Sequence, residues 1–226
     1  DHNLFERLKG LSDYTRGYLD AIMLAQQKIY GRFFLEELLH PSVIEDLQRS
    51  VPYSPMSDGT EPLAYVYANY FLARKVTSNE RISLLRQISD RFPLDLYSHN
   101  PSPLIPNARF MGTADYYEQM PLVFRHSKIN LNISLKSIYS GIPLRCMDIM
   151  GSGAFLLSNY QADFFDDFVP EEDFVYYESE EDCLHKINYY LTHEAERLQI
   201  ASSAGGKIKD RHTFVHRVKT MLSVIG

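Results

Sequence analysis

The sequence predicts an α/β fold, in which a parallel sheet of about five strands carries helices on both faces and follows a helical leader. Residues 1–92 show helical spacing of apolar residues, whereas residues 93–226 alternate short apolar runs with helical patterns. The texture changes near Phe92. We therefore expect a helical leader over residues 1–92, packed on an α/β domain over residues 93–226.

The leader contains three helical patterns. In the first, apolar residues recur three or four positions apart, at Tyr18, Ile22, Ala25, Ile29 and Phe33. A second helix is predicted to start at Pro41, because proline is favoured in the first turn, and a third to start at Ser78. The turn-rich stretch "PYSPMSDGTEP" separates the second helix from the third.

Five short apolar runs after Phe92 are the strand candidates. They cover residues 94–99, 108–112, 128–134, 154–159 and 174–179. Helical patterns lie between them, and two or three helices close the chain from Glu180 onward. Strands that alternate with helices form βαβ units, so the strands should be parallel and should bind ligands at their carboxyl ends.

Composition and charge limit the function classes. The 226 residues are 45% hydrophobic, which is enough for a core, and a formal net charge of -6 argues against a nucleic-acid partner. No apolar run approaches the roughly 20 residues of a transmembrane helix. We therefore expect no transmembrane segment. Cys146 and Cys183 lack metal-ligand or redox spacing, so we expect a reduced, cytoplasmic compartment.

Residues 140–160, "SGIPLRCMDIMGSGAFLLSNY", are the strongest candidate for a site. Gly141 permits close approach of a ligand to the backbone, and the helix expected from Leu144 offers unpaired N–H groups at its amino terminus. Arg145 and Asp148 lie three residues apart and share one helix face. An anion-binding site and a surface Arg–Asp ion pair both fit this spacing.

The same region resembles a known family. "MDIMGSGAFLLSNY" is similar to the nucleotide-sugar-binding signature of GT-B glycosyltransferases, with Asp148 in place of the usual glutamate and Gly153 five residues later. "MGTADYYEQMPLVFRHSKINLNIS" and "YYLTHEAERLQIASSAGGKIKDRHTFVHRV" resemble the CgeB-like, spore-maturation branch. The resemblance implies a Rossmann-like, donor-binding half of a GT-B fold and a retaining glycosyltransferase.

The resemblance also implies a ligand and roles for particular residues. The ligand is a nucleotide-diphosphate sugar, with a UDP-sugar as the expected donor, no tightly bound cofactor and no metal. Asp148 would accept hydrogen bonds from the ribose hydroxyls. Gly141 and Arg145 would hold the diphosphate.

Further site residues follow from the same resemblance. The loop after the second strand, from Gly112 to Tyr116 and Tyr117, would lie near the base or the ribose. Asn132 would lie at a strand end below the phosphates. With Gly141, Arg145 and Asp148, the residues expected to bind the donor are therefore Gly112, Tyr117 and Asn132.

The chain departs from the family pattern at three points. Asp148 reaches one methylene less far than glutamate, and Ser140 stands where many members have a second glutamate. Since 226 residues leave no room for it, we expect the acceptor-binding N-terminal domain of a GT-B enzyme to be missing from this chain and the chain to be incomplete for turnover.

A second function class stays open beside the glycosyltransferase. The same fold could be a non-catalytic α/β interaction module with a vestigial nucleotide crevice. His212 and His216 lie four residues apart on an expected helix, but no Glu or Cys cluster accompanies them. Packing or helix capping is therefore the favoured role for this segment.

Overall fold

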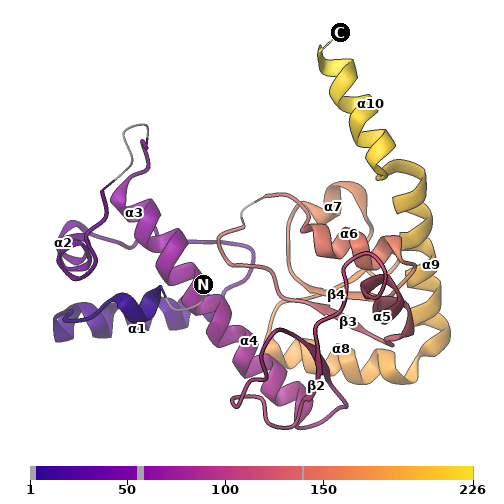
Figure 1. Ribbon diagram of the computed structural model, residues 1–226, viewed down its shortest axis with the longest axis horizontal. Coiled ribbons are helices and arrows are strands. Elements are labelled where there is room, and N and C mark those ends of the chain that lie inside the picture. The colour runs from indigo at the N-terminus through magenta and orange to yellow at the C-terminus, as the bar shows by residue number, and fades with distance from the viewer. Residues whose placement is uncertain (1–3, 55–58, 139, 226) are drawn as a thin grey trace. The chain divides into compact units, whose positions relative to one another are not determined.

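The computed structural model describes residues 4–54, 59–138 and 140–225 (Figure 1). The chain divides into two compact units. The helical unit comprises residues 1–92, 104–107 and 134–139, and the α/β unit comprises residues 93–103, 108–133 and 140–226. Each unit has its own cluster of buried hydrophobic side chains.

The helical unit is built from helices joined by turns. Its elements are η1 (Phe5–Arg7), α1 (Asp13–Lys28), α2 (Pro41–Ser50), α3 (Leu63–Val66), η2 (Tyr67–Leu72) and α4 (Ala73–Ser89). Pro41 occupies the first turn of α2, as predicted. The last three elements follow one another without a break, and η2 has π geometry.

Two helix boundaries in this unit differ from the predicted ones. α1 ends at Lys28, because Ile29 is extended and Gly31 has a φ of 76°. Phe33 lies beyond the helix but still packs against the same core, which explains why the apolar periodicity continues. Ser78 lies inside α4 rather than at a helix start, because the helical run begins at Leu63.

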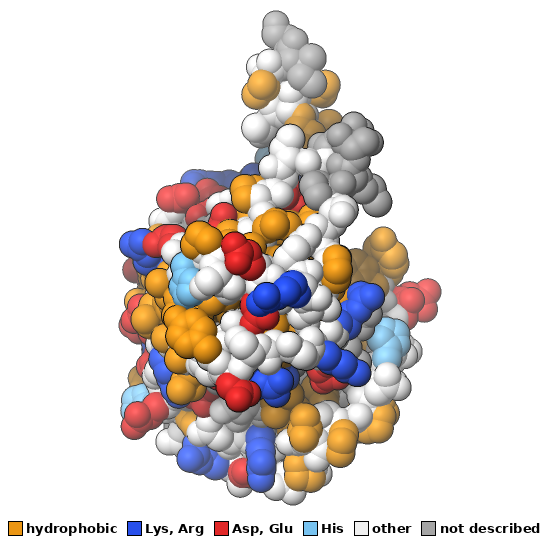
Figure 2. Space-filling view, turned by 90° about the vertical axis from the view of Figure 1, so that its left-hand side faces the viewer, with side chains coloured by type: hydrophobic (Ala, Val, Ile, Leu, Met, Phe, Trp, Pro, Cys, Tyr) orange, Lys and Arg blue, Asp and Glu red, His pale blue; other side chains and the backbone are white. Residues whose placement is uncertain are grey.

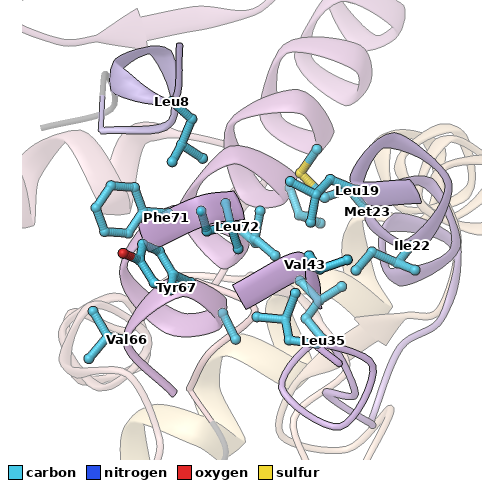
Figure 3. Packing of buried hydrophobic residues seen from close by; sticks show 14 of the residues in the cluster. Leu8, Leu19, Ile22, Met23, Leu35, Val43, Val66, Tyr67, Phe71 and Leu72 are labelled. Carbon is cyan, nitrogen blue, oxygen red and sulfur yellow. The ribbon is translucent and has the colours of Figure 1, made fainter. Parts of the chain in front are cut away.

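The core of the helical unit joins side chains from each of its longer helices. Figure 3 shows Leu19 of α1, Val43 of α2 and Leu72 of η2 in one apolar cluster. Tyr67 is fully buried, and its hydroxyl donates a hydrogen bond to the Val51 carbonyl oxygen at 2.6 Å. The one polar atom of this ring therefore has a partner inside the core.

Five parallel strands lie in the described part of the α/β unit, each inside a predicted run. They are β1 (Asp95–Tyr97), β2 (Arg109–Gly112), β3 (Asn130–Asn132), β4 (Leu156–Asn159) and β5 (Val175–Tyr177). β1 pairs with β2, and β4 lies between β3 and β5. All three pairings are parallel, as expected for βαβ units.

The strands form two sheets, of two and three strands, rather than the single sheet of about five strands that the sequence predicts. Every residue of β4 is buried, as suits the centre of a covered sheet. In β2, by contrast, Arg109, Phe110 and Met111 are exposed, and Arg109 forms a surface ion pair with Asp95 of β1. The apolar residues Phe110 and Met111 of β2 are therefore left exposed, unlike those of a strand in a covered sheet.

Helices connect and cover the three-stranded sheet. They are α5 (Met120–His126), α6 (Leu144–Gly151), α7 (Phe164–Asp167), α8 (Glu180–Thr192), α9 (Glu194–Arg211) and α10 (Phe214–Ile225). Figure 1 shows α6 above β3 and β4, and α8 below them. The three helices after Glu180 agree with the prediction for the end of the chain.

Small residues let α9 approach the end of α6 closely. A Cβ atom at Gly205 would lie 3.4 Å from both the Cα atom of Gly153 and the carbonyl oxygen of Met150. A Cβ atom at Gly151 would lie 3.2 Å from the side chain of Ile208. Larger residues at these positions would push the two segments apart.

A buried carboxylate also holds α9 in place. Asp173, 1% exposed, pairs with Lys207 and accepts hydrogen bonds from Ser203 Oγ at 2.6 Å and from the Val169 N–H at 2.8 Å. Burial raises the pKa of Asp173, but these partners lower it by more, so the net pKa lies below its ordinary value. The carboxylate thus links the turn before β5 to α9.

Surface charge is mixed on the face shown in Figure 2, where acidic and basic side chains are interspersed. Within the described ranges, no helix has the length and apolar character needed to cross a membrane.

Replacing Leu47 with Ala should lower the free energy of unfolding by about 2 to 5 kcal/mol, because the change removes buried contacts and leaves a cavity. Leu47 is fully buried in the helical core. Denaturant unfolding monitored by circular dichroism measures the loss. Leu24→Ala is the control, since Leu24 is 60% exposed and should cost less than about 0.5 kcal/mol. Equal losses in the two variants would contradict the described core.

Candidate functional site

A groove of about 870 Å³ lies in the α/β unit. Its walls come from the loop after β2, from α5, α6 and α7, and from the junction of α9 with α10. Much of the lining is apolar, contributed by Met120, Phe124, Ile142, Leu144, Met147, Ile208 and Phe214. A groove of this size is large enough for a ligand such as a nucleotide.

α6 separates this groove from the core. Cys146, Ile149 and Met150 are buried in the hydrophobic cluster of the unit, whereas Met147 and Asp148 line the groove. The helical repeat of 3.6 residues sets this division between the two faces. Burial raises the pKa of the Cys146 thiol to about 12, so this cysteine is inert packing rather than a nucleophile.

Asp148 forms the central polar contact of the groove. Its Oδ2 atom accepts a hydrogen bond from the Tyr116 hydroxyl at 2.7 Å. This hydrogen bond is the main cause of the raised pKa of Tyr116, and the positive charge of Arg145 acts in the opposite direction. Arg145 is exposed in the first turn of α6 and lies within electrostatic reach of this pair, although it does not line the groove.

Tyr117 stands beside this pair at the rim. Its side chain is 84% exposed, and its ring meets that of Tyr116 edge-on, with ring centroids 5.1 Å apart. Asp115 accepts hydrogen bonds from the N–H groups of Tyr117 and Glu118, which fixes the turn that presents both tyrosines. The exposed ring offers an aromatic face to a ligand.

The glycine turn before α6 already has an anionic partner. Gly141 has a φ of 85°, a conformation that favours glycine, and its N–H donates a hydrogen bond to the carboxylate of Asp163. Among the described residues, no side chain caps the amino terminus of α6. The turn can therefore bind an anion, and a carboxylate of the chain itself occupies one of its donors.

His212 lies at the junction of α9 and α10. Its side chain is 5% exposed and stacks on the ring of Phe168, with centroids 5.1 Å apart. Arg217 Nη2 donates a hydrogen bond to His212 Nδ1 at 3.0 Å, so this nitrogen is the unprotonated one. Asp167 lies 3.9 Å from the same nitrogen.

The lining is acidic overall. Four carboxylates face one guanidinium, that of Arg217, and the carboxylates belong to Asp148, Asp163, Asp166 and Asp167. Among the residues that the structure describes, no group of three or more His, Cys, Asp or Glu side chains is arranged to hold a metal ion.

The residues expected to bind a donor do not all line the groove. Tyr117, Gly141 and Asp148 line the groove, and Arg145 lies beside it. Gly112 ends β2 with a φ of 77° and is not part of the lining. The remaining one, Asn132, has its own partner in the sheet.

Asn132 is 6% exposed at the carboxyl end of β3. Its Nδ2 atom donates a hydrogen bond to Ser158 Oγ of β4 at 3.0 Å. The amide thus ties two neighbouring strands together, and the residue lies outside the groove lining.

Sequence reasoning did not single out Asp163, His212 or Arg217 as groove residues. Asp163 stands in the acidic stretch "QADFFDDF", which indicates a solvated helix start when it is read alone. His212 and Arg217 belong to "RHTFVHR", where two histidines at helical spacing draw attention to metal binding instead. Neither stretch carries a local sequence pattern which shows that its residues line the same groove as α6.

Parallel strands, a helix amino terminus and a groove of this volume define the class as an α/β protein, a class that often binds ligands in such a crevice. A family model described as "Glycosyl transferase-like" matches residues 78–223. The chain belongs to this glycosyl transferase-like family, whose general activity is the transfer of sugars. No curated protein matches the chain.

The stability of this region should depend on pH through His212. Burial is the main cause that lowers the pKa of His212 below its ordinary 6.5, and Arg217 lowers it further. As the pH falls below 6.5, the unfolded chain takes up the proton first, so the free energy of unfolding should decrease. Denaturant unfolding between pH 8 and pH 5 should therefore show a flatter profile for His212→Gln than for the unchanged chain. Parallel profiles would contradict the effect.

Proposed function

We propose that this chain is the donor-binding portion of a retaining glycosyltransferase of the CgeB-like branch. The donor is a nucleotide-diphosphate sugar, a UDP-sugar in the first instance, and it is a substrate rather than a resident cofactor. An acceptor-binding domain completes the enzyme, which acts in the cytoplasm. Membership in the glycosyl transferase-like family supports the general activity, and the finer statements are part of this proposal.

The observation that carries the proposal is the arrangement around α6. Asp148 lines a groove beside the Tyr116 hydroxyl, while Arg145 stands within electrostatic reach in the first turn of the same helix. A carboxylate is a good acceptor for two ribose hydroxyls, and a guanidinium suits a diphosphate. The exposed ring of Tyr117 gives the base a surface for stacking.

In this arrangement the sugar-nucleotide bond breaks with negative charge developing on the leaving diphosphate. Arg145 and the amino terminus of α6 stabilise that charge. The Tyr116 hydroxyl keeps the Asp148 carboxylate oriented, so that its second oxygen remains directed for a ribose hydroxyl. These residues bind and orient the donor, and the acceptor comes from elsewhere in the enzyme.

A specific observation favours the second candidate, a non-catalytic interaction module. The N–H of Gly141 is occupied by Asp163, and four aspartates line the groove. Such a lining repels a diphosphate unless the cations nearby compensate. Calorimetry of the full chain against UDP-, GDP-, ADP- and dTDP-sugars separates the two functions, because a module with a vestigial crevice binds none of them.

Replacing Arg145 with Ala should weaken binding of the nucleotide sugar by about 1.5 to 3 kcal/mol, which is roughly ten- to a hundredfold, because a charge-assisted contact is lost. Calorimetric titration measures the change. Lys at position 145 should recover only part of the affinity, since an ammonium lacks the planar fork. Asp148→Asn should cost less than Arg145→Ala, because an amide oxygen still accepts a hydrogen bond.

If the unchanged chain and Arg145→Ala bind every nucleotide sugar equally weakly and differ only in melting temperature, Arg145 is a structural residue of α6. Thermal unfolding of both chains therefore accompanies the titrations.

Replacing Asp163 with Ala should strengthen binding of the nucleotide sugar by about two- to fivefold, because the Gly141 N–H becomes available to phosphate and one repulsive charge disappears. Asp166→Ala is the matched control. It removes the same charge from the same groove but leaves the hydrogen bond between Gly141 and Asp163 in place. Equal gains in the two variants would show that charge alone matters, and not the occupied N–H.

A further inference from the structure

The end of the groove at the junction of α9 and α10 carries a buried polar ring with one nitrogen left open. His212 lines the groove, and its side chain is 5% exposed. Arg217 donates to Nδ1 at 3.0 Å, so the other ring nitrogen, Nε2, carries the proton. Among the described residues, no group accepts a hydrogen bond from Nε2, and this atom is not fully buried. Its N–H is therefore available to a ligand in the groove.

Neighbouring groups hold the imidazole ring of His212 in this state. The ring stacks on Phe168, and Arg217 selects the tautomer because a guanidinium only donates hydrogen bonds. Burial is the main cause that lowers the pKa of His212 below 6.5, although Asp167 acts in the opposite direction. The ring is therefore neutral near pH 7, and it offers a ligand one donor and no acceptor.

A carboxylate accompanies this donor. Asp167 Oδ2 lies 3.9 Å from His212 Nδ1, which is too far for a hydrogen bond, and the Asp167 side chain is 48% exposed. Asp167 lines the groove, and in the described part of the chain nothing donates a hydrogen bond to its carboxylate. Phe214 lines the same end of the groove and is exposed. This end thus offers one donor, one acceptor and an aromatic face.

The order of residues along α6 matches the order of groups in a nucleotide. The proposed function places the diphosphate at the Gly141 turn and the ribose at Asp148. About one turn further, a Cβ atom at Gly151 would lie 3.2 Å from the side chain of Ile208 in α9. The N–H of His212 donates to the Ile208 carbonyl oxygen at 2.9 Å. The base follows the ribose in the ligand, so the base is the part that reaches His212.

The wall formed by α7 gives the same order. Asp163 precedes this helix and accepts a hydrogen bond from the Gly141 N–H. Asp167 ends the helix and lies beside the ring of His212. The diphosphate end and the base end of the groove are therefore one short helix apart.

We propose that His212 and Asp167 recognise the base of the donor nucleotide, with the His212 Nε2–H donating to a carbonyl oxygen of the base and the Asp167 carboxylate accepting from the ring N–H beside it. Uracil, thymine and guanine present this acceptor and donor side by side. Adenine and cytosine present an amino group beside an unprotonated ring nitrogen instead. The inference rests on the proposed function for the diphosphate and the ribose. Arg217 is a positioning residue, because it acts through the tautomer of His212.

Calorimetric titration of the full chain with UDP, GDP, ADP and CDP tests this selection. UDP and GDP should bind roughly ten- to a hundredfold more tightly than ADP and CDP, because a mismatched base places donor against donor and acceptor against acceptor. All four ligands carry the same diphosphate, so the ratio reports the base. Binding without this preference overturns the inference and leaves the donor site in place. Failure of all four to bind overturns the inference together with the proposed function.

The donor is tested by His212→Phe, which keeps an aromatic ring against Phe168 but has no N–H. The preference for UDP over CDP should fall by about tenfold, and His212→Gln should recover part of it because its amide still donates. The matched control is His216→Phe, the same change at a histidine outside the groove lining, and it should leave the preference unchanged. A preference that survives His212→Phe overturns the role of His212.

The acceptor is tested by Asp167→Asn, whose amide donates as well as accepts. ADP and CDP should gain about tenfold in affinity relative to UDP. Asp166→Asn removes the same charge from the same groove, so it should strengthen binding of all four nucleotides alike and leave the ratios unchanged. Each ratio is measured on one protein, so a general change in charge or stability cancels. Equal ratios in the two variants overturn the role of Asp167.

The positioning role of Arg217 has a spectroscopic test. Nitrogen-15 NMR of the histidine rings near pH 7.5 should show the Nε2–H tautomer for His212 in the unchanged chain and a mixture of tautomers in Arg217→Ala. The signal of His212 is the one that His212→Gln lacks. Arg217→Lys, which keeps a donor, should restore the tautomer. A tautomer that stays the same in Arg217→Ala shows that Arg217 does not position the ring, and this part of the inference is then wrong.

Discussion

The burial of one face of α6 is the constraint on which the groove depends. Cys146, Ile149 and Met150 are held in the core, so the rotation of the helix about its axis is fixed. Side chains three and four residues apart share a face, and the outward face therefore presents Asp148 to the groove. The close approach of α9 at Gly205 restrains the end of α6. A rotation that moved Asp148 out of the groove would expose the core.

The backbone N–H of Gly141 explains why one carboxylate lies at the glycine turn of the groove. Gly141 has a positive φ in the turn before α6, and its backbone N–H needs an acceptor. Asp163 supplies that acceptor from the segment before α7. A phosphate oxygen is an acceptor that needs hydrogen-bond donors and positive charge, so the same N–H would suit it. In the proposed function, the Asp163 carboxylate and the diphosphate therefore compete for this N–H, and the positive charge of Arg145 in the first turn of α6 favours the diphosphate.

Local patterns predicted the strands and the placement of α2, because short apolar runs and a first-turn proline act within a few residues. The division into two sheets depends on burial instead, and the exposed residues of β2 look like a covered strand in the sequence. The three-residue spacing of Arg145 and Asp148 predicted that the two share one helix, and both lie in α6. Asp163, by contrast, is distant in sequence and comes near Gly141 only through the tertiary fold. Asn132 was predicted to bind the donor because it is a polar residue at a strand end, but its side chain donates a hydrogen bond to Ser158 of the neighbouring strand instead.

The two units are interleaved along the chain, which limits how independently either can form. Residues 104–107 and 134–139 belong to the helical unit, although the elements on either side of each segment, β1 and β2 for the first and β3 and α6 for the second, belong to the α/β unit. Asn107 donates a hydrogen bond to Asp90 at 2.7 Å in the first segment, and Lys136 pairs with Glu80 in the second. The middle of α4 and its C-cap residue, Asp90, thus contact the two segments. The contacts that Lys136 makes in the second segment therefore require that α4 be folded, even though α4 contributes no side chain to the groove lining.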